Sequence, residues 1–157
     1  MISRREALAL GGCVSAGALA GCAGFGSDTE YLTLELLNFD SEPHEVAVEA
    51  LRADADEHSE AAVLRERYDL ETPPEAEDRV ASQQLEENVL ESDRYLVRVH
   101  LEDAPATRES YQYYPDCSSA DDTSDRLFIE VRTERESEEL YIEFKQNRCS
   151  GSGSGWV

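Results

Sequence analysis

Three segments of the sequence place apolar side chains at every second position: residues 94–101 (RYLVRVHL), 126–133 (RLFIEVRT) and 139–146 (ELYIEFKQ). A period of two is the spacing of side chains along a β-strand, and it gathers these apolar groups on one face. Each such strand must bury that face against another layer, while its second face stays in water. The pattern predicts an all-β fold with inward positions Tyr95, Val97, Val99, Leu101, Leu127, Ile129, Val131, Leu140, Ile142 and Phe144.

Shorter segments add strands at residues 30–39 (EYLTLELLNF), 45–51 (EVAVEAL) and 110–115 (SYQYYP). In the first of these, Leu32, Leu34 and Leu36 share one face, and Leu37 and Phe39 make the other face partly apolar. The second follows a turn at DSEPH, and the third is rich in aromatic side chains.

Two segments in the middle of the chain are ambiguous. Residues 59–71 (SEAAVLRERYDLE) have helical propensity, but a strand that ends in RYDL before the proline pair 73–74 fits the surrounding periodicity better. Residues 75–92 are compatible with a strand or with a charged helical turn around Val80, Leu85 and Val89.

Turn-rich stretches separate these segments at the spacing found in sandwiches. Seven or eight antiparallel strands in about 120 residues predict one β-sandwich of immunoglobulin-like type over residues 30–149. The tryptophan that packs in antibody domains has no counterpart, because Trp156 lies in the tail. The expectation therefore concerns architecture and implies no antibody kinship.

The chain is strongly acidic, with 35 Asp and Glu against 14 Lys and Arg and a net charge of -21. Such acidity either binds a cationic partner or ion, or keeps the surface of the protein solvated in very salty water. The acids are scattered through the whole chain, which favours solvation, because a binding site concentrates its charges. No basic residues cluster along the sequence, so we expect no nucleic-acid partner.

The first 21 residues have the layout of an export signal, with Arg4 and Arg5 before a weakly apolar run over residues 7–20. The run is shorter than the roughly 20 residues that a membrane-spanning helix needs. The motif SRREAL looks like a twin-arginine signal, although Ala7 replaces a bulky residue. An accidental arginine pair is the alternative.

Residues 19–22 (LAGC) resemble a lipobox, the processing site of lipoproteins. The resemblance implies that Cys22 is the first mature residue and carries a lipid, so that the lipid membrane is a partner. Ordinary cleavage beside small residues is the alternative. Residues 22–29 then form the lipidated N-terminus and tether, and residues 150–157 (SGSGSGWV) a flexible tail.

Cysteine counting supports the lipid assignment. Cys13 leaves with the signal and Cys22 carries the anchor, so Cys117 and Cys149 remain as an even pair in an exported chain. We expect them to form a disulfide at the ends of two strands, with a pair of free buried thiols as the alternative.

Metal and cofactor chemistry has little support in the sequence. A blue-copper site needs two histidines, a cysteine and usually a methionine, but Met1 is the only methionine and no histidine follows Cys117. Residues 54–58 (DADEH) form a solvated acidic loop or a weak cation site, without the spacing of a calcium loop. We expect no metal and no cofactor.

Catalytic motifs are missing as well. The sequence has no Gly-x-Ser-x-Gly elbow and no glycine-rich phosphate loop, so we expect no enzyme. The tyrosines Tyr111, Tyr113 and Tyr114 fit strand packing better than a binding face.

Together, SRREAL, LAGC, the acidic domain and the two late cysteines resemble small lipoproteins exported by halophilic archaea. The resemblance implies attachment at the outer face of the cell membrane. Two function classes follow: a non-enzymatic module that binds an unknown protein or ligand, or a solute- or metal-binding accessory subunit of a transporter or redox chain.

Overall fold

The computed structural model describes residues 29–54, 61–75, 80–117 and 124–149. The predicted export signal with Arg4 and Arg5, the predicted lipidation site Cys22 and the tail 150–157 lie outside these residues. The same holds for residues 55–60, and hence for most of the acidic loop.

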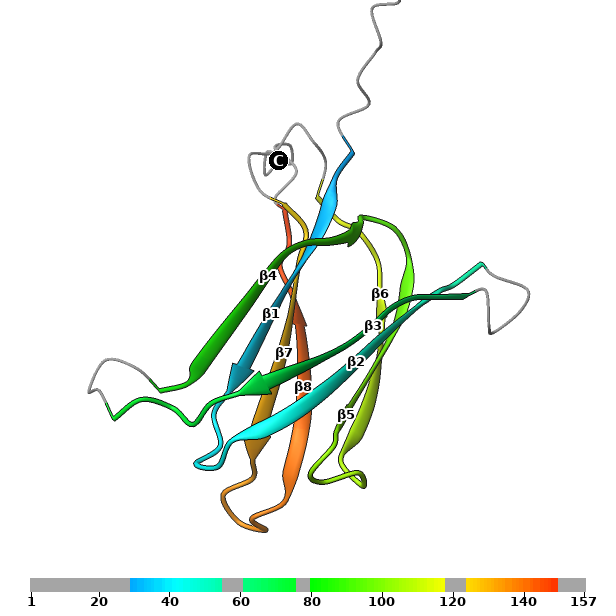
Figure 1. Ribbon diagram of the computed structural model, residues 1–157. Helices are drawn as coiled ribbons and strands as arrows, with labels where there is room; N and C mark the ends of the chain where they lie inside the picture. The colour runs from blue at the N-terminus through cyan, green and yellow to red at the C-terminus, as the bar shows by residue number, and fades with distance from the viewer. Residues whose placement is uncertain (1–28, 55–60, 76–79, 118–123, 150–157) are drawn as a thin grey trace, which may run out of the picture.

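Eight strands make up the described part of the chain: β1 (Tyr31–Asn38), β2 (His44–Arg52), β3 (Ala62–Leu70), β4 (Ser82–Glu91), β5 (Tyr95–Leu101), β6 (Arg108–Tyr113), β7 (Arg126–Thr133) and β8 (Leu140–Gln146). They form two four-stranded sheets, in the orders β4-β1-β7-β8 and β3-β2-β5-β6 (Figure 1). The predicted all-β, sandwich-like fold and its number of strands are confirmed.

One strand pair departs from the predicted antiparallel arrangement. β1 runs parallel to β7, with Leu34 beside Leu127 and Leu36 beside Ile129. A parallel pair needs a long crossover, and here the five strands β2 to β6 supply it. In immunoglobulin domains the first strand pairs with the second, whereas here β1 pairs with β4 and β7. The immunoglobulin-like strand order is therefore not confirmed.

Both ambiguous segments contain strands. β3 ends at Leu70, shortly before the proline pair, as the preferred interpretation predicted. β4 is an edge strand whose pairing with β1 shifts between Leu32 and Leu34, so that residues 87–89 bulge opposite one residue of β1. Asn88 has a φ of 55° within this bulge, a left-handed conformation that asparagine tolerates better than most residues. The bulge breaks the alternation that would have identified a strand.

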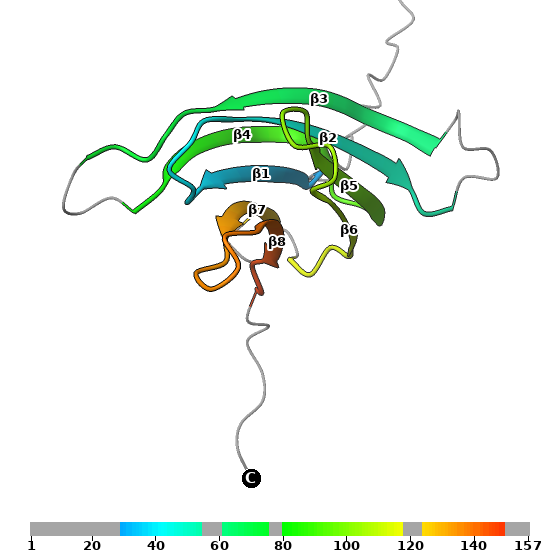
Figure 2. The same cartoon turned by 90° about the horizontal axis from the view of Figure 1, so that it is seen from below.

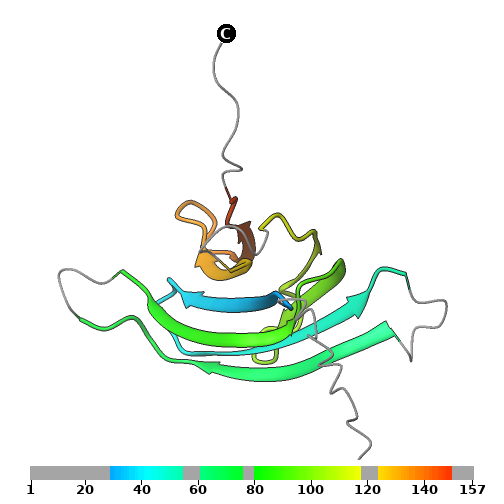
Figure 3. The same cartoon turned by 90° about the horizontal axis from the view of Figure 1, so that it is seen from above.

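The core lies between the two sheets. The inward positions of β5 and β7 are buried as predicted, together with Leu32, Leu34 and Leu36 of β1 and Val46 and Val48 of β2. Seen from below and from above, β7 and β8 lie on one side of the molecule and β2 and β3 on the other (Figures 2 and 3).

The outer face of the β4-β1-β7-β8 sheet is covered by its own ion pairs. Glu130 is only 5% exposed, and its carboxylate contacts Arg132 at 2.6 Å and Lys145 at 2.8 Å. Glu35 is 7% exposed, lies 2.9 Å from Arg126 and accepts a hydrogen bond from Gln83. The predicted wet face is wrong for Glu130, because neighbouring long side chains cover it, and Glu35 is covered in the same way.

Candidate functional site

The outer face of the β3-β2-β5-β6 sheet carries four arginines and a histidine, with four glutamates beside them: Glu49, Glu66, Glu102 and Glu109. We call it the arginine face and define it by Arg65, Arg67, Arg98, His100 and Arg108. Strand alternation explains the placement, because Val97, Val99 and Leu101 point into the core and leave Arg98 and His100 outside.

The register of the sheet brings these residues into two rows. One row across the four strands is Arg67, Ala47, His100 and Arg108; the next is Arg65, Glu49, Arg98 and Ser110. Directly opposed side chains in neighbouring strands lie about 5 Å apart at their Cβ atoms. The cations of three strands therefore share one surface.

Ion pairs orient several of these arginines. Arg65 donates to Glu49 at 2.8 Å, and Arg98 lies 3.7 Å from the same carboxylate. Arg67 lies 3.1 Å and His100 3.4 Å from Glu102. Within the described part of the chain Arg108 makes no ion pair, so its guanidinium faces solvent.

Two shallow hollows mark the arginine face. The first lies over Ala47, whose small side chain leaves room between Arg67, His100 and Arg108. The second has half-buried Leu96 as an apolar floor, next to Leu51, which is only 3% exposed. Its remaining polar and aromatic lining includes Arg52, Arg94, Gln112 and Tyr114.

Arg98 lines both hollows and joins them. Beside the second hollow, the Arg94 guanidinium lies 5.9 Å from the centre of the exposed Tyr114 ring. A cation over an aromatic face is a favourable contact that also orients the guanidinium. The two hollows adjoin at Arg98. Arg108 lies in the first hollow, and Arg94 and the aromatic ring of Tyr114 lie in the second.

The sequence did not reveal this face. Arg65, Arg67, Arg98 and Arg108 meet only through strand pairing, so they form no cluster along the sequence. The first hollow, which they line, also holds Glu49, Glu66, Glu102 and Glu109. The acids Glu45, Glu49 and Glu102 lie among the arginines. The expectation of no nucleic-acid partner stays a prediction.

A second cluster lies at the end of the sandwich where β2 begins. His44 is 5% exposed, and its ring contacts Asp40 through Nε2 at 2.9 Å and Asp103 through Nδ1 at 2.8 Å. Asp40 also accepts a hydrogen bond from Thr133 at the end of β7. The cluster therefore ties β2 to loops and strands of both sheets.

Both carboxylates of this cluster are stabilised as anions. Burial raises the pKa of Asp40, but hydrogen bonds from Thr133, His44 and backbone N–H groups outweigh it, and the pKa lies below 3.8. Burial also raises the pKa of Asp103, and hydrogen bonds from His44 and from backbone N–H groups outweigh it, so this pKa is lowered as well. Because each ring nitrogen faces a carboxylate, neither is left to serve as a base toward a substrate. We interpret the cluster as a structural clamp.

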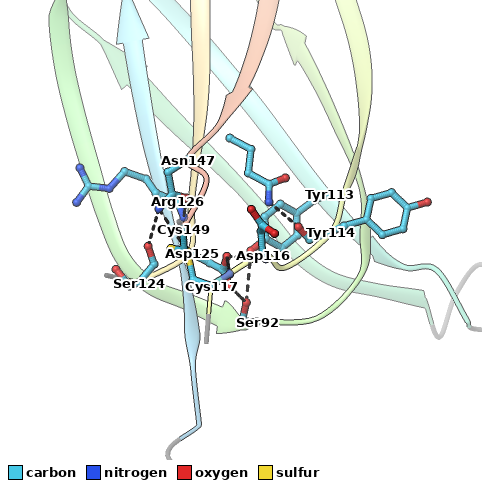
Figure 4. The surroundings of a disulfide bond; sticks show 11 residues. Ser92, Tyr113, Tyr114, Asp116, Cys117, Ser124, Asp125, Arg126, Asn147 and Cys149 are labelled. Carbon is cyan, nitrogen blue, oxygen red and sulfur yellow. Dashed lines mark hydrogen bonds between the residues drawn. A yellow bond between two sulfur atoms is a disulfide. The ribbon is translucent and has the colours of Figure 1, made fainter. Parts of the chain in front are cut away.

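The opposite end of the sandwich holds the predicted disulfide. Cys117 and Cys149 are bonded, with their Cα atoms 5.0 Å apart, so this prediction is confirmed. Beside the bond, fully buried Asp125 accepts hydrogen bonds from the backbone N–H groups of Asp116 and Cys117 and from the Ser92 hydroxyl (Figure 4). This network fastens the segment after β6 to the start of β7.

The three tyrosines of the SYQYYP segment have different environments. Tyr113 is fully buried, and burial raises the pKa of its hydroxyl. Tyr111 stacks on Phe144 of β8 with ring centres 5.3 Å apart. Only Tyr114 presents its ring to solvent, at the second hollow. The packing interpretation therefore holds for two tyrosines and fails for the third.

In the described ranges, no group of three or more His, Cys, Asp or Glu side chains is arranged to hold a metal ion. His100 belongs to the arginine face, His44 to the clamp, and His58 lies outside the described residues. The described residues contain no helix that is long and apolar enough to cross a membrane.

Comparison with protein-family models and with curated protein sequences finds no match to this chain. The function of the chain is therefore inferred from its own surface.

Proposed function

We propose that this protein is a lipid-anchored, non-enzymatic surface module that binds an anionic partner through its arginine face. The twin-arginine-like motif and the lipobox-like LAGC motif support export and attachment through Cys22 at the outer face of the membrane. The resemblance to haloarchaeal lipoproteins supports a salty exterior as the working environment.

The single observation that carries the binding proposal is the gathering of six arginines around two adjoining hollows in a chain with a net charge of -21, although four glutamates also line the first hollow. Cations on both sheets pair with carboxylates, but the carboxylates differ in exposure. The side chains of Glu49 and Glu102 on the arginine face are 26% and 32% exposed. Those of Glu35 and Glu130 on the opposite sheet are 10% and 6% exposed, so a ligand can reach the ion pairs of the arginine face more readily. Guanidinium groups recognise carboxylates and other oxyanions through paired hydrogen bonds.

High salt does not abolish such recognition. At about 1 M salt the Debye length is about 3 Å, so long-range attraction is screened while hydrogen bonds at contact distance persist. Binding by the arginine face therefore depends on close contact more than on the net charge of the protein.

Thermal melting in molar potassium chloride tests the proposal with a panel of anions: poly-L-glutamate, polygalacturonate, polyphosphate and acetate. At least one polymeric anion is expected to raise the melting temperature of the wild type, and the double substitution of Arg67 and Arg98 to serine is expected to abolish that rise. Arg135→Ser is the control, because Arg135 is exposed in the turn between β7 and β8. No shift with any anion contradicts the proposal.

The same panel addresses the second function class. A shift with monomeric acetate as large as that with the polymers would favour a solute-binding accessory subunit. Attachment is tested separately, because Cys22→Ser is expected to release the protein from membranes, and full retention of this variant contradicts lipid anchoring.

A further inference from the structure

We infer that the ligand of the arginine face is an extended, carboxylate-bearing polysaccharide that spans both hollows. This inference rests on the proposed function and names the class of partner.

Carboxylates already occupy this surface in the folded chain. Glu49 lies 2.8 Å from Arg65 and 3.7 Å from Arg98, and Glu102 lies 3.1 Å from Arg67. The guanidinium groups are thus oriented by carboxylate groups of the kind that a uronic acid carries. Glu49 is an internal competitor for Arg98, the residue shared by the two hollows.

The distance between the hollows requires a ligand longer than one sugar. Along β5, His100 of the first hollow and Leu96 of the second are separated by four residues, or about 13 Å at about 3.3 Å per residue. The hollows meet at Arg98, so a single uronic acid fills at most part of this length, whereas a chain of several sugars extends through both hollows.

The second hollow favours a sugar ring over an acidic peptide. Half-buried Leu96 forms a small apolar floor beside the exposed ring of Tyr114, with Arg94 above that ring. A pyranose has an apolar C–H face and polar edges, so a uronic acid can lie on this floor while its carboxylate meets a guanidinium. A sugar chain is also stiffer than a peptide and loses less entropy when it is ordered.

The edges of this sheet are poorly suited to an added peptide strand. β3 exposes Arg65, Glu66 and Arg67 in succession, and β6 begins with exposed Arg108 and Glu109. Charged edge strands oppose strand addition. A ligand is therefore expected to bind on the face of the sheet and not at its edge. A polysaccharide suits that face, because it does not need to form backbone hydrogen bonds with an edge strand.

Calorimetry with oligogalacturonates of two, four and six sugars in molar potassium chloride tests the inference. Affinity is expected to rise about tenfold from the disaccharide to the tetrasaccharide, because the longer chain meets guanidinium groups in both hollows. The tetrasaccharide is expected to bind more tightly than a glutamate peptide of matched charge or single-stranded DNA. A neutral galactose oligomer is expected not to bind.

Two substitutions that remove the same charge sharpen the test. Glu49→Gln removes the carboxylate that pairs with Arg65 and lies beside Arg98, and it is expected to raise the affinity for the tetrasaccharide about threefold to tenfold. Glu143→Gln, on the outer face of the other sheet, is expected to leave it unchanged. Tyr114→Ala is expected to weaken the tetrasaccharide at least threefold and the disaccharide by less.

Several outcomes overturn the inference. A preference for the glutamate peptide or for DNA would replace the polysaccharide with another anion while leaving the proposed function intact. Equal affinity for the oligogalacturonates of all three lengths would show that the ligand does not span both hollows. An equal gain in affinity from Glu49→Gln and Glu143→Gln would show that only the net charge of the protein matters. Absence of binding by every anion would reject the proposed function itself.

Discussion

Replacing His44 with alanine should destabilise the fold more than any other single histidine change in the described chain. The ring lies within hydrogen-bond distance of two carboxylates, at 2.9 Å to Asp40 and 2.8 Å to Asp103, and these are hydrogen bonds to charged groups. Each such bond contributes about 1.5–3 kcal/mol. Asp40 is 13% exposed and belongs near the top of that range, whereas Asp103 is 46% exposed and belongs near the bottom.

The expected loss in the free energy of unfolding is therefore about 4–4.5 kcal/mol. For a domain of this size the melting temperature changes by roughly 4 °C per kcal/mol, so a fall of roughly 16–18 °C is expected.

Urea unfolding in molar potassium chloride, followed by circular dichroism, measures this loss. His100→Ala is the matched control, because His100 is exposed, and its effect should stay within about 0.5 kcal/mol. Adding Asp40→Asn to His44→Ala should recover at least about 1 kcal/mol, because it removes a mostly buried carboxylate that has lost its imidazole partner. A loss below about 1 kcal/mol for His44→Ala, or no recovery in the double variant, would refute the clamp.

Three further predictions concern the stability of the whole domain. Cys117→Ser should lower the free energy of unfolding by roughly 3–4 kcal/mol, because the bond to Cys149 closes a loop with a sequence separation of 32, and an unchanged urea midpoint would contradict this. Asp103 has a lowered pKa in the folded state, so its stabilising effect is complete above the unfolded pKa and is lost as the pH falls through the folded value. The stability difference between wild type and Asp103→Asn should therefore be largest near neutral pH and shrink as the pH falls through the pKa of the folded state; a difference that is constant with pH would count against this. Transfer from molar to millimolar salt should unfold the domain, and an unchanged circular dichroism spectrum would remove the halophilic interpretation.

Strand identity was predictable wherever alternation is regular. The β5 and β7 segments have inward valines, leucine and isoleucine that are all fully or nearly fully buried. β4 was ambiguous, because its bulge at Asn88 interrupts the period and its sequence is rich in Gln and Glu. The parallel pairing of β1 with β7 has no signal along the sequence, since either direction buries the same apolar face.

The disulfide was predictable from cysteine counting, whereas the candidate site was not. Arg65 and Arg98 lie on strands that are far apart in the sequence, and only the antiparallel register through Glu49 brings them together. The covered carboxylate of Glu130 was missed for a similar reason, because Arg132 and Lys145 reach over it only after β7 and β8 pair. Charge patterns that depend on pairing across a sheet are invisible in a linear scan.

The location of a bound anion tests the central claim most directly. Nuclear magnetic resonance can follow the arginine side chains and backbone amides of the labelled protein during titration with the galacturonate tetrasaccharide in molar salt. The account predicts that resonances of Arg67, Arg98 and Arg108 and of the outward positions of β2, β3, β5 and β6 shift together, while those of β7 and β8 stay unchanged. Shifts centred on Arg126, Arg132 or the β7 and β8 strands would contradict it.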